Sequence, residues 1–199
     1  MIRLYVETNF VLELTFDQEQ SAACEQLRDF AEEGRVELVV PAYCLAEPHE
    51  TFVRRRKKRQ ISQNEIEAEL KQLRRSTSYK VAAEQIELVA ALFAASAQED
   101  LARLEDAVTR LAEAATLLPL TPRVVRRAYH LQKYMDIGPQ DSFVLASVLD
   151  DLDDRPSSKA WFANRNTKDF EDPDVEALLA DRNCQLLTSF GAAVGLIRH

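Results

Sequence analysis

Glycine is scarce in this chain, with four residues among 199. Tight turns between strands depend on glycine, so the scarcity argues against an all-β fold. The sequence offers no glycine-rich loop to cradle a phosphate and no serine, histidine and aspartate set for acyl transfer. Its three histidines occupy unrelated positions, and we expect them at the surface: His49 (a weak exception because it lies near Glu47), His130 and His199.

Cysteines and long apolar runs are scarce as well. Cys24, Cys44 and Cys184 are odd in number and far apart, so we expect free, mostly buried thiols in a reducing compartment. No apolar run approaches the roughly 20 residues of a membrane span. The first residues lack the basic segment and apolar core of a signal peptide. We therefore expect a soluble cytoplasmic protein with no membrane partner.

The charge balance is acidic, with a net charge of −8. This argues against a broadly basic nucleic-acid coat, although it leaves room for a local basic groove. An acidic balance also suits a site that gathers carboxylates around a metal ion. The length suits one domain, or one domain with an insertion.

Strands and helices alternate near both ends of the sequence. Apolar strands are predicted at residues 2–6, 36–41 and 159–163, with a short last strand within 183–190. Helices are predicted from Phe10, at 19–33, from about Pro48, at 122–135, from Pro139, at 173–181 and at 192–197. Strand, helix and strand with short connections indicate a helix-rich α/β fold with a parallel sheet covered by helices.

The middle of the sequence, residues 62–118, is almost continuously helical in pattern, with no glycine or proline between Pro48 and Pro119. We interpret 60–118 as a helical insertion or arm of two or three helices within a single domain, 1–199. For 84–118 the alternative is a coiled-coil partner helix, although its alanine-rich pattern drifts from a strict heptad.

Four acidic side chains fall at strand ends or at the start of a helix. Glu7 follows the first strand. Glu47 lies just past the second strand, where Pro48 predicts a break between a short turn and a new helix. Asp141 falls in the first turn of a helix, and Asp169 follows the third strand. Because right-handed crossovers bring the carboxyl ends of parallel strands to one side, we expect these acids to cluster.

Clustered carboxylates repel one another unless a cation lies among them. All-oxygen ligands suit Mg²⁺ or Mn²⁺, which orient phosphates and acidify water, as phosphodiester hydrolysis requires. In the simpler alternative, Thr8 or Asn9 caps the following helix and Glu7 is an ordinary exposed acid. The acids at 150, 151, 153 and 154 fit a solvated helix end better than a second metal site.

Four segments, YVETNFVLEL, LVVPAYCLAEP, QDSFVLASVL and ANRNTKDF, occur in this order. Together they resemble the PIN (PilT N-terminal) domain family over roughly residues 1–56 and 121–197. The resemblance implies a three-layer α/β/α fold and Mg²⁺- or Mn²⁺-dependent ribonuclease activity. Its implied catalytic and metal-binding residues are Glu7, Glu47, Asp141 and Asp169, supported by Thr8, Asn9, Asn164 and Asn166. Thr8 and Asn9 would orient the first acid.

Many members of that family are VapC-type toxins, which cut RNA, are silenced by a small antitoxin and often form homodimers. Three departures bear on this implication. The family usually has Asp where this sequence has Glu7, Asn166 is neutral where some relatives carry an acid, and 62–118 is longer than compact toxins need. A PIN-like binding module without turnover is therefore the alternative. A phosphohydrolase with an aspartyl nucleophile is a third, which Glu7 disfavours.

Six consecutive bases follow Glu47: Arg54, Arg55, Arg56, Lys57, Lys58 and Arg59. They form either a solvated helix face or a surface for RNA phosphates, and binding of the second kind weakens steeply with salt. Aromatic residues near the run are sparse in the sequence, limited to Phe52 and Tyr79. We therefore expect no sequence-specific reading of bases.

Overall fold

A five-stranded parallel sheet forms the centre of the protein in a computed structural model. The structure describes residues 2–135, 137–165, 170 and 172–198, without the side chains of 80–85. The strands are β1 (Ile2–Val6), β2 (Val36–Pro41), β3 (Thr116–Leu118), β4 (Ala160–Ala163) and β5 (Cys184–Leu187). They lie in the order β3-β2-β1-β4-β5, so β1 is central. Its carboxyl end therefore opens between two neighbouring strands.

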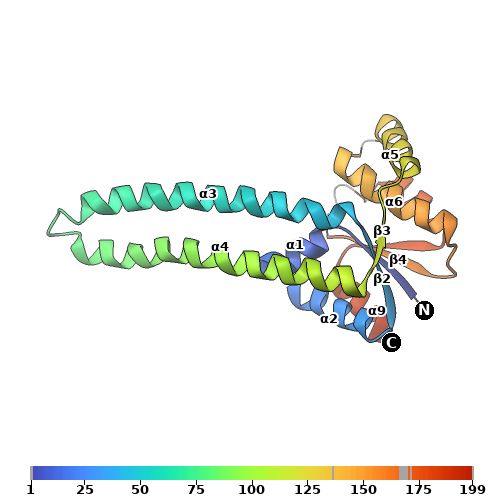
Figure 1. Ribbon diagram of the computed structural model, residues 1–199, viewed down its shortest axis with the longest axis horizontal. Coiled ribbons are helices and arrows are strands. Elements are labelled where there is room, and N and C mark those ends of the chain that lie inside the picture. The colour runs from blue at the N-terminus through green and yellow to red at the C-terminus, as the bar shows by residue number, and fades with distance from the viewer. Residues whose placement is uncertain (1, 136, 166–169, 171, 199) are drawn as a thin grey trace.

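Helices cover both faces of this sheet and give three layers (Figure 1). On one side lie α1 (Thr8–Phe16), α2 (Ser21–Glu32) and α9 (Phe190–Arg198); on the other lie α5 (Pro122–Tyr134) and α6 (Pro139–Asp154). Helix α8 (Pro173–Ala180) precedes β5. Gly34, with a φ of 70°, follows α2 in the left-handed conformation that ends many helices. The predicted three-layer parallel α/β/α fold is confirmed.

Two long helices extend from the body as an arm (Figure 1). Helix α3 (Tyr43–Leu73) and helix α4 (Lys80–Ala114) lie side by side and contain 31 and 35 residues. At a rise of 1.5 Å per residue they are about 46 and 52 Å long. Within the described residues, no helix combines the length and the apolar character needed to cross a bilayer.

The break predicted at Pro48 is wrong, because α3 continues through it. The amide that proline lacks would have bonded the carbonyl of Cys44, in the first turn of the helix. A single missing bond so close to the helix start leaves the remaining turns intact. The arm therefore grows directly out of the element that carries Glu47.

The prediction that residues up to 118 are helical is also wrong at its end. Helix α4 stops at Ala114, and Thr116–Leu118 forms β3. This strand pairs with the edge of β2, with Leu117 opposite Val40. Three residues are too few to show a period of two, so only the pairing reveals this strand. The other predicted strands and helices are present, with bounds shifted by about one to two residues.

Candidate active site

Glu7 begins the site where β1 ends and α1 begins. It is itself the N-cap of α1: its Oε2 accepts a hydrogen bond from the Asn9 amide at 2.9 Å. The cap is therefore the glutamate and not Thr8 or Asn9, as the simpler alternative had it. Only 4% of Glu7 is exposed, so it is not an ordinary surface acid. The other carboxylate oxygen, Oε1, is buried and has no hydrogen-bond partner.

Glu47 approaches from the first turns of α3. Its Oε2 accepts a hydrogen bond from the Thr8 hydroxyl at 2.5 Å. Thr8 was predicted to orient the first acid, but its hydroxyl orients the second, while the Asn9 amide holds the first. The bond from Thr8 ties the end of β1 to α3, and the two bonds together fix one oxygen of each glutamate.

Asp141 lies in the first turn of α6, where the helix dipole favours a negative charge. Pro139 begins this helix and Gly138 caps it. A methyl group on Gly138 would lie 2.9 Å from Asp141 Oδ2, closer than carbon and oxygen tolerate. The glycine therefore leaves the space that this carboxylate occupies.

The three acids line one cavity of about 580 Å³. Its described lining comes from the end of β1 with α1, from α3 and from α6: Glu7, Thr8, Asn9, Leu12, Glu47, Thr51, Arg54, Arg55, Lys58, Gln140, Asp141 and Val144. Three of the six consecutive bases thus face the same space as the acids. Thr51 and Gln140 were not predicted; Thr51 lies one helical turn beyond Glu47 and could have been found by that spacing.

Electrostatics couple these carboxylates. The pKa of Glu7 is raised from 4.5 to about 8, mainly by burial and to a smaller extent by the negative charges of Asp141 and Glu47. The hydrogen bonds from Asn9 oppose the shift by stabilising the ionised form. A cation placed in this cavity would relieve both the burial cost and the repulsion.

The site suits a hard divalent cation in its donor chemistry. Every acidic donor is a carboxylate, and Glu7 Oε1 is a buried oxygen without a partner. Among the described residues, however, no three His, Cys, Asp or Glu side chains already form a coordination cluster. Mg²⁺ commonly binds through one or two carboxylates and completes its shell with water and phosphate. The arrangement fits that kind of open site better than a closed cage.

The remaining predicted site residues lie elsewhere. Arg59 pairs with buried Asp100 across the arm at 2.5 Å, and Arg56 lines a second cavity between α3 and α4. Lys57 is exposed and is outside the described lining of the acidic cavity. Asn164 is buried at the end of β4 and is also outside that lining. Asn166 and Asp169 fall outside the residues that the structure describes.

A buried ion pair beside the site was not predicted. Glu13 of α1 is 1% exposed; one of its oxygens pairs with Arg165 and the other accepts from the Gln20 amide at 2.7 Å. Arg165 directly follows Asn164 and also contacts Glu19. The pair fastens the chain after β4 to α1. A glutamate inside an apolar helical pattern was the only signal for it in the sequence.

The comparison with protein families agrees with this arrangement. A family model described as "PIN domain" matches residues 4–170. The matched range includes all three acids of the cavity and both helices of the arm. No curated protein matches the chain.

Proposed function

The chain belongs to the PIN domain family, whose members are generally nucleases, and we propose that it is an endoribonuclease that depends on Mg²⁺ or Mn²⁺. The observation that carries the proposal is the shared cavity of Glu7, Glu47 and Asp141, in which one glutamate oxygen is buried without a partner. A hard divalent cation satisfies such a group of carboxylates and can bind a substrate phosphate at the same time.

Glu7, Glu47 and Asp141 would hold the ion, with Asp169 in the fourth acidic position. A divalent ion there would polarise a phosphate oxygen and lower the pKa of the attacking water. The protein itself keeps the carboxylates in place: the Asn9 amide fixes Glu7 and the Thr8 hydroxyl fixes Glu47. Asp141 would join them from the first turn of α6, since it lines the same cavity.

Basic side chains beside the acids would bind the RNA backbone. Arg54, Arg55 and Lys58 line the same cavity from the next turns of α3. Arg55 is held over the ring of Phe16, with the guanidinium carbon 3.9 Å from the ring centre. A guanidinium stacked in this way keeps its charge and its position. These bases counter the repulsion between the acidic cavity and an anionic substrate.

The test of this function is cleavage of assorted RNAs with Mn²⁺ by the wild-type protein and by Asp141→Asn. We expect cleavage only by the wild type, and its loss when the metal is chelated. Equal cleavage by both proteins, or by neither across a broad panel, would count against the proposal. RNA binding without cleavage, independent of metal and of Glu7→Asp, would instead favour the non-cutting binding module.

The wider setting is part of the same proposal. We take the arm, the part of 60–118 that precedes β3, as an insertion within a single domain. We take the protein as the toxin of a toxin–antitoxin pair, with a small protein inhibitor and a homodimeric form. The three buried, free cysteines fit a reducing cytoplasm. A neighbouring small reading frame whose product blocks cleavage would support the toxin assignment, and a chromosome without one would oppose it.

Replacing Lys58 by alanine should weaken RNA binding and flatten its salt dependence. The plot of log binding constant against log salt concentration should lose about 0.7 of its slope, because one phosphate contact disappears. Fluorescence anisotropy at several salt concentrations measures this. Lys57→Ala is the matched control, since Lys57 belongs to the same run but lies outside the described lining. Equal slopes for the two variants would refute the assigned contact.

Replacing Gly138 by alanine should lower cleavage by about 10- to 100-fold, because the new methyl group displaces the Asp141 carboxylate. The backbone of Gly138, at φ −59° and ψ 154°, accepts alanine, so stability should change by less than about 1 kcal/mol. Steady-state kinetics and thermal unfolding measure the two effects. Gly191→Ala is the control, since a methyl group there meets no atom within 4 Å.

A further inference from the structure

Three aromatic side chains from different helices form a connected group beside the acidic cavity. The rings of Tyr43 on α3 and Phe143 on α6 are stacked, with centres 6.1 Å apart and planes at 29°. Tyr129 on α5 meets Phe143 edge to face, with centres 6.2 Å apart. These residues are far apart in the sequence, so only the fold assembles them.

The aromatic group lies next to the acids. Tyr43 is one helical turn before Glu47, and burial, followed by the charge of Glu47, raises the pKa of the Tyr43 hydroxyl. Gln140, which lines the cavity, hydrogen-bonds Tyr43 and lies one turn before Phe143. The group therefore adjoins the cavity at the start of α3, whereas Arg54, Arg55 and Lys58 lie farther along α3.

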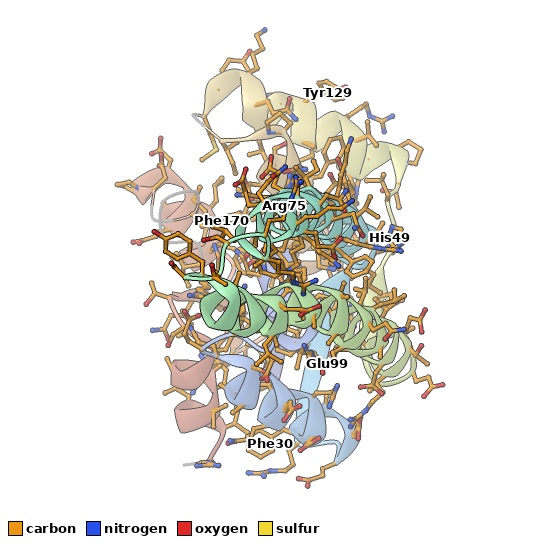
Figure 2. The ribbon with its side chains drawn as sticks, turned by 90° about the vertical axis from the view of Figure 1, so that its left-hand side faces the viewer. Phe30, His49, Arg75, Glu99, Tyr129 and Phe170 are labelled. Carbon is orange, nitrogen blue, oxygen red and sulfur yellow. The ribbon has the colours of Figure 1, made fainter. Side chains whose placement is uncertain are left out.

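Tyr129 is more exposed to solvent than a side chain that only packs against its neighbours. It is 64% exposed, and Figure 2 shows it on the outer surface of α5. The same helix exposes Tyr134 to the same extent, next to Lys133, whose amine lies 5.1 Å from the Tyr134 ring centre. Proteins that bind single-stranded nucleic acid usually present a surface on which basic side chains alternate with exposed aromatic rings.

Helix α3 sets the distances along the cavity. Tyr43, Glu47, Thr51, Arg55 and Lys58 recur at three- or four-residue steps and so share one face of the helix. At 1.5 Å per residue, Tyr43 lies about 6 Å before Glu47 along the axis, and Arg55 about 12 Å beyond it. Along the axis of α3, the aromatic group thus comes first, the acidic side chains next and the basic side chains last.

We propose that unpaired bases of the RNA stack on Tyr129, Phe143 and Tyr43 on one side of the scissile phosphate, while Arg54, Arg55 and Lys58 hold phosphates on the other. This inference rests on the proposed ribonuclease function and assigns the side chains that hold the RNA bases next to the cleaved bond. In an A-form duplex the bases are stacked on each other and their faces are closed to side chains. The basic side chains Arg54, Arg55 and Lys58 line the adjoining acidic cavity. A polyanion such as RNA therefore matches the charge of this surface.

The proposal is tested by measuring how a fluorescent 12-nucleotide RNA binds to the full chain carrying Asp141→Asn. The RNA is used both as a single strand and as one strand of a duplex. In that background Tyr129→Ala should weaken binding of the single strand about 5- to 150-fold, the loss typical of one stacked base. Phe143→Leu fills the partly buried position but lacks an aromatic face, and it should weaken binding in the same range. Tyr129→Phe should bind within twofold of the parent, because the ring remains.

Tyr79 at the far end of the arm is the matched control, since it is 56% exposed and remote in sequence from the site. Tyr79→Ala should leave binding unchanged, and duplex binding should be insensitive to Tyr129→Ala. Normal RNA binding that ignores both Tyr129→Ala and Phe143→Leu would overturn the stacking surface and leave the ribonuclease proposal standing. An equal loss for strand and duplex would also overturn it. Failure of the parent to bind any RNA would remove both proposals.

Discussion

Replacing Glu7 by glutamine is expected to abolish RNA cleavage while stabilising the metal-free protein. Glutamine keeps the length of the side chain and an oxygen that can accept from the Asn9 amide, so the cap of α1 survives. It removes a buried negative charge that faces Asp141 and Glu47. Sites that gather like charges for function commonly gain stability when one charge is lost.

The stabilisation should depend on pH. The pKa of Glu7 is raised from 4.5 to about 8 in the folded protein, so folding favours its protonated form. The stability that protonated Glu7 contributes is complete below pH 4.5 and is lost as pH rises through 8. Glu7→Gln should therefore match the wild type near pH 4 and exceed it by roughly 3 kcal/mol above pH 8, somewhat less than the full shift implies.

Urea unfolding in EDTA across that pH range, together with a cleavage assay, measures both effects. Mg²⁺ should then raise the melting temperature of the wild type but not that of Glu7→Gln, because a ligand stabilises only the state that binds it. Glu105→Gln, at an exposed position of the arm, is the control for a simple change of net charge. A pH-independent difference between wild type and Glu7→Gln would contradict the raised pKa of the buried Glu7.

Replacing Arg165 by alanine is expected to destabilise the protein by about 3 kcal/mol, because it leaves the buried carboxylate of Glu13 without its cationic partner. The Gln20 amide would then be its one described hydrogen-bond donor. The loss should appear in urea unfolding as a lower midpoint with an unchanged slope.

The exposed pair of Arg110 and Glu32 provides the control for Arg165. Arg110→Ala removes a pair of similar chemistry at the surface and should cost less than about 1 kcal/mol. Combining Arg165→Ala with Glu13→Gln should recover part of the stability, since position 13 then carries no charge. Equal losses of stability in Arg165→Ala and Arg110→Ala would show that the buried pair of Glu13 and Arg165 stabilises the protein no more than a surface pair does.

Much of the fold and of the acidic cavity follows from the local sequence. Strands rich in Val, Ile and Leu, separated by helical periods, leave few options besides a parallel sheet, and the carboxyl ends of its strands meet at one edge. That rule predicts from the sequence alone that Glu7 lies near Glu47 and Asp141. It did not depend on whether Pro48 interrupts a helix, which explains why a wrong prediction there left the position of Glu47 unaffected.

What the sequence could not supply depends on contacts between distant segments. Strand β3 is identified only by its pairing with β2. Which bases of the run face the cavity depends on how α3 is rotated, and α4 sets that rotation partly through the pair of Arg59 with Asp100. The stacked rings of Tyr43 and Phe143 join α3 to α6 through residues that are 100 positions apart in the sequence. Aromatic residues near the site therefore looked sparse along the chain but are not sparse in space.

Anomalous scattering from Mn²⁺ in crystals of the protein tests the central claim most directly. The account predicts one strong peak in the cavity, within coordination distance of Glu7 Oε1 and of oxygens from Glu47 or Asp141, and its loss in Asp141→Asn. Saturating Mn²⁺ with no peak among these carboxylates, or an unchanged peak in Asp141→Asn, would contradict it.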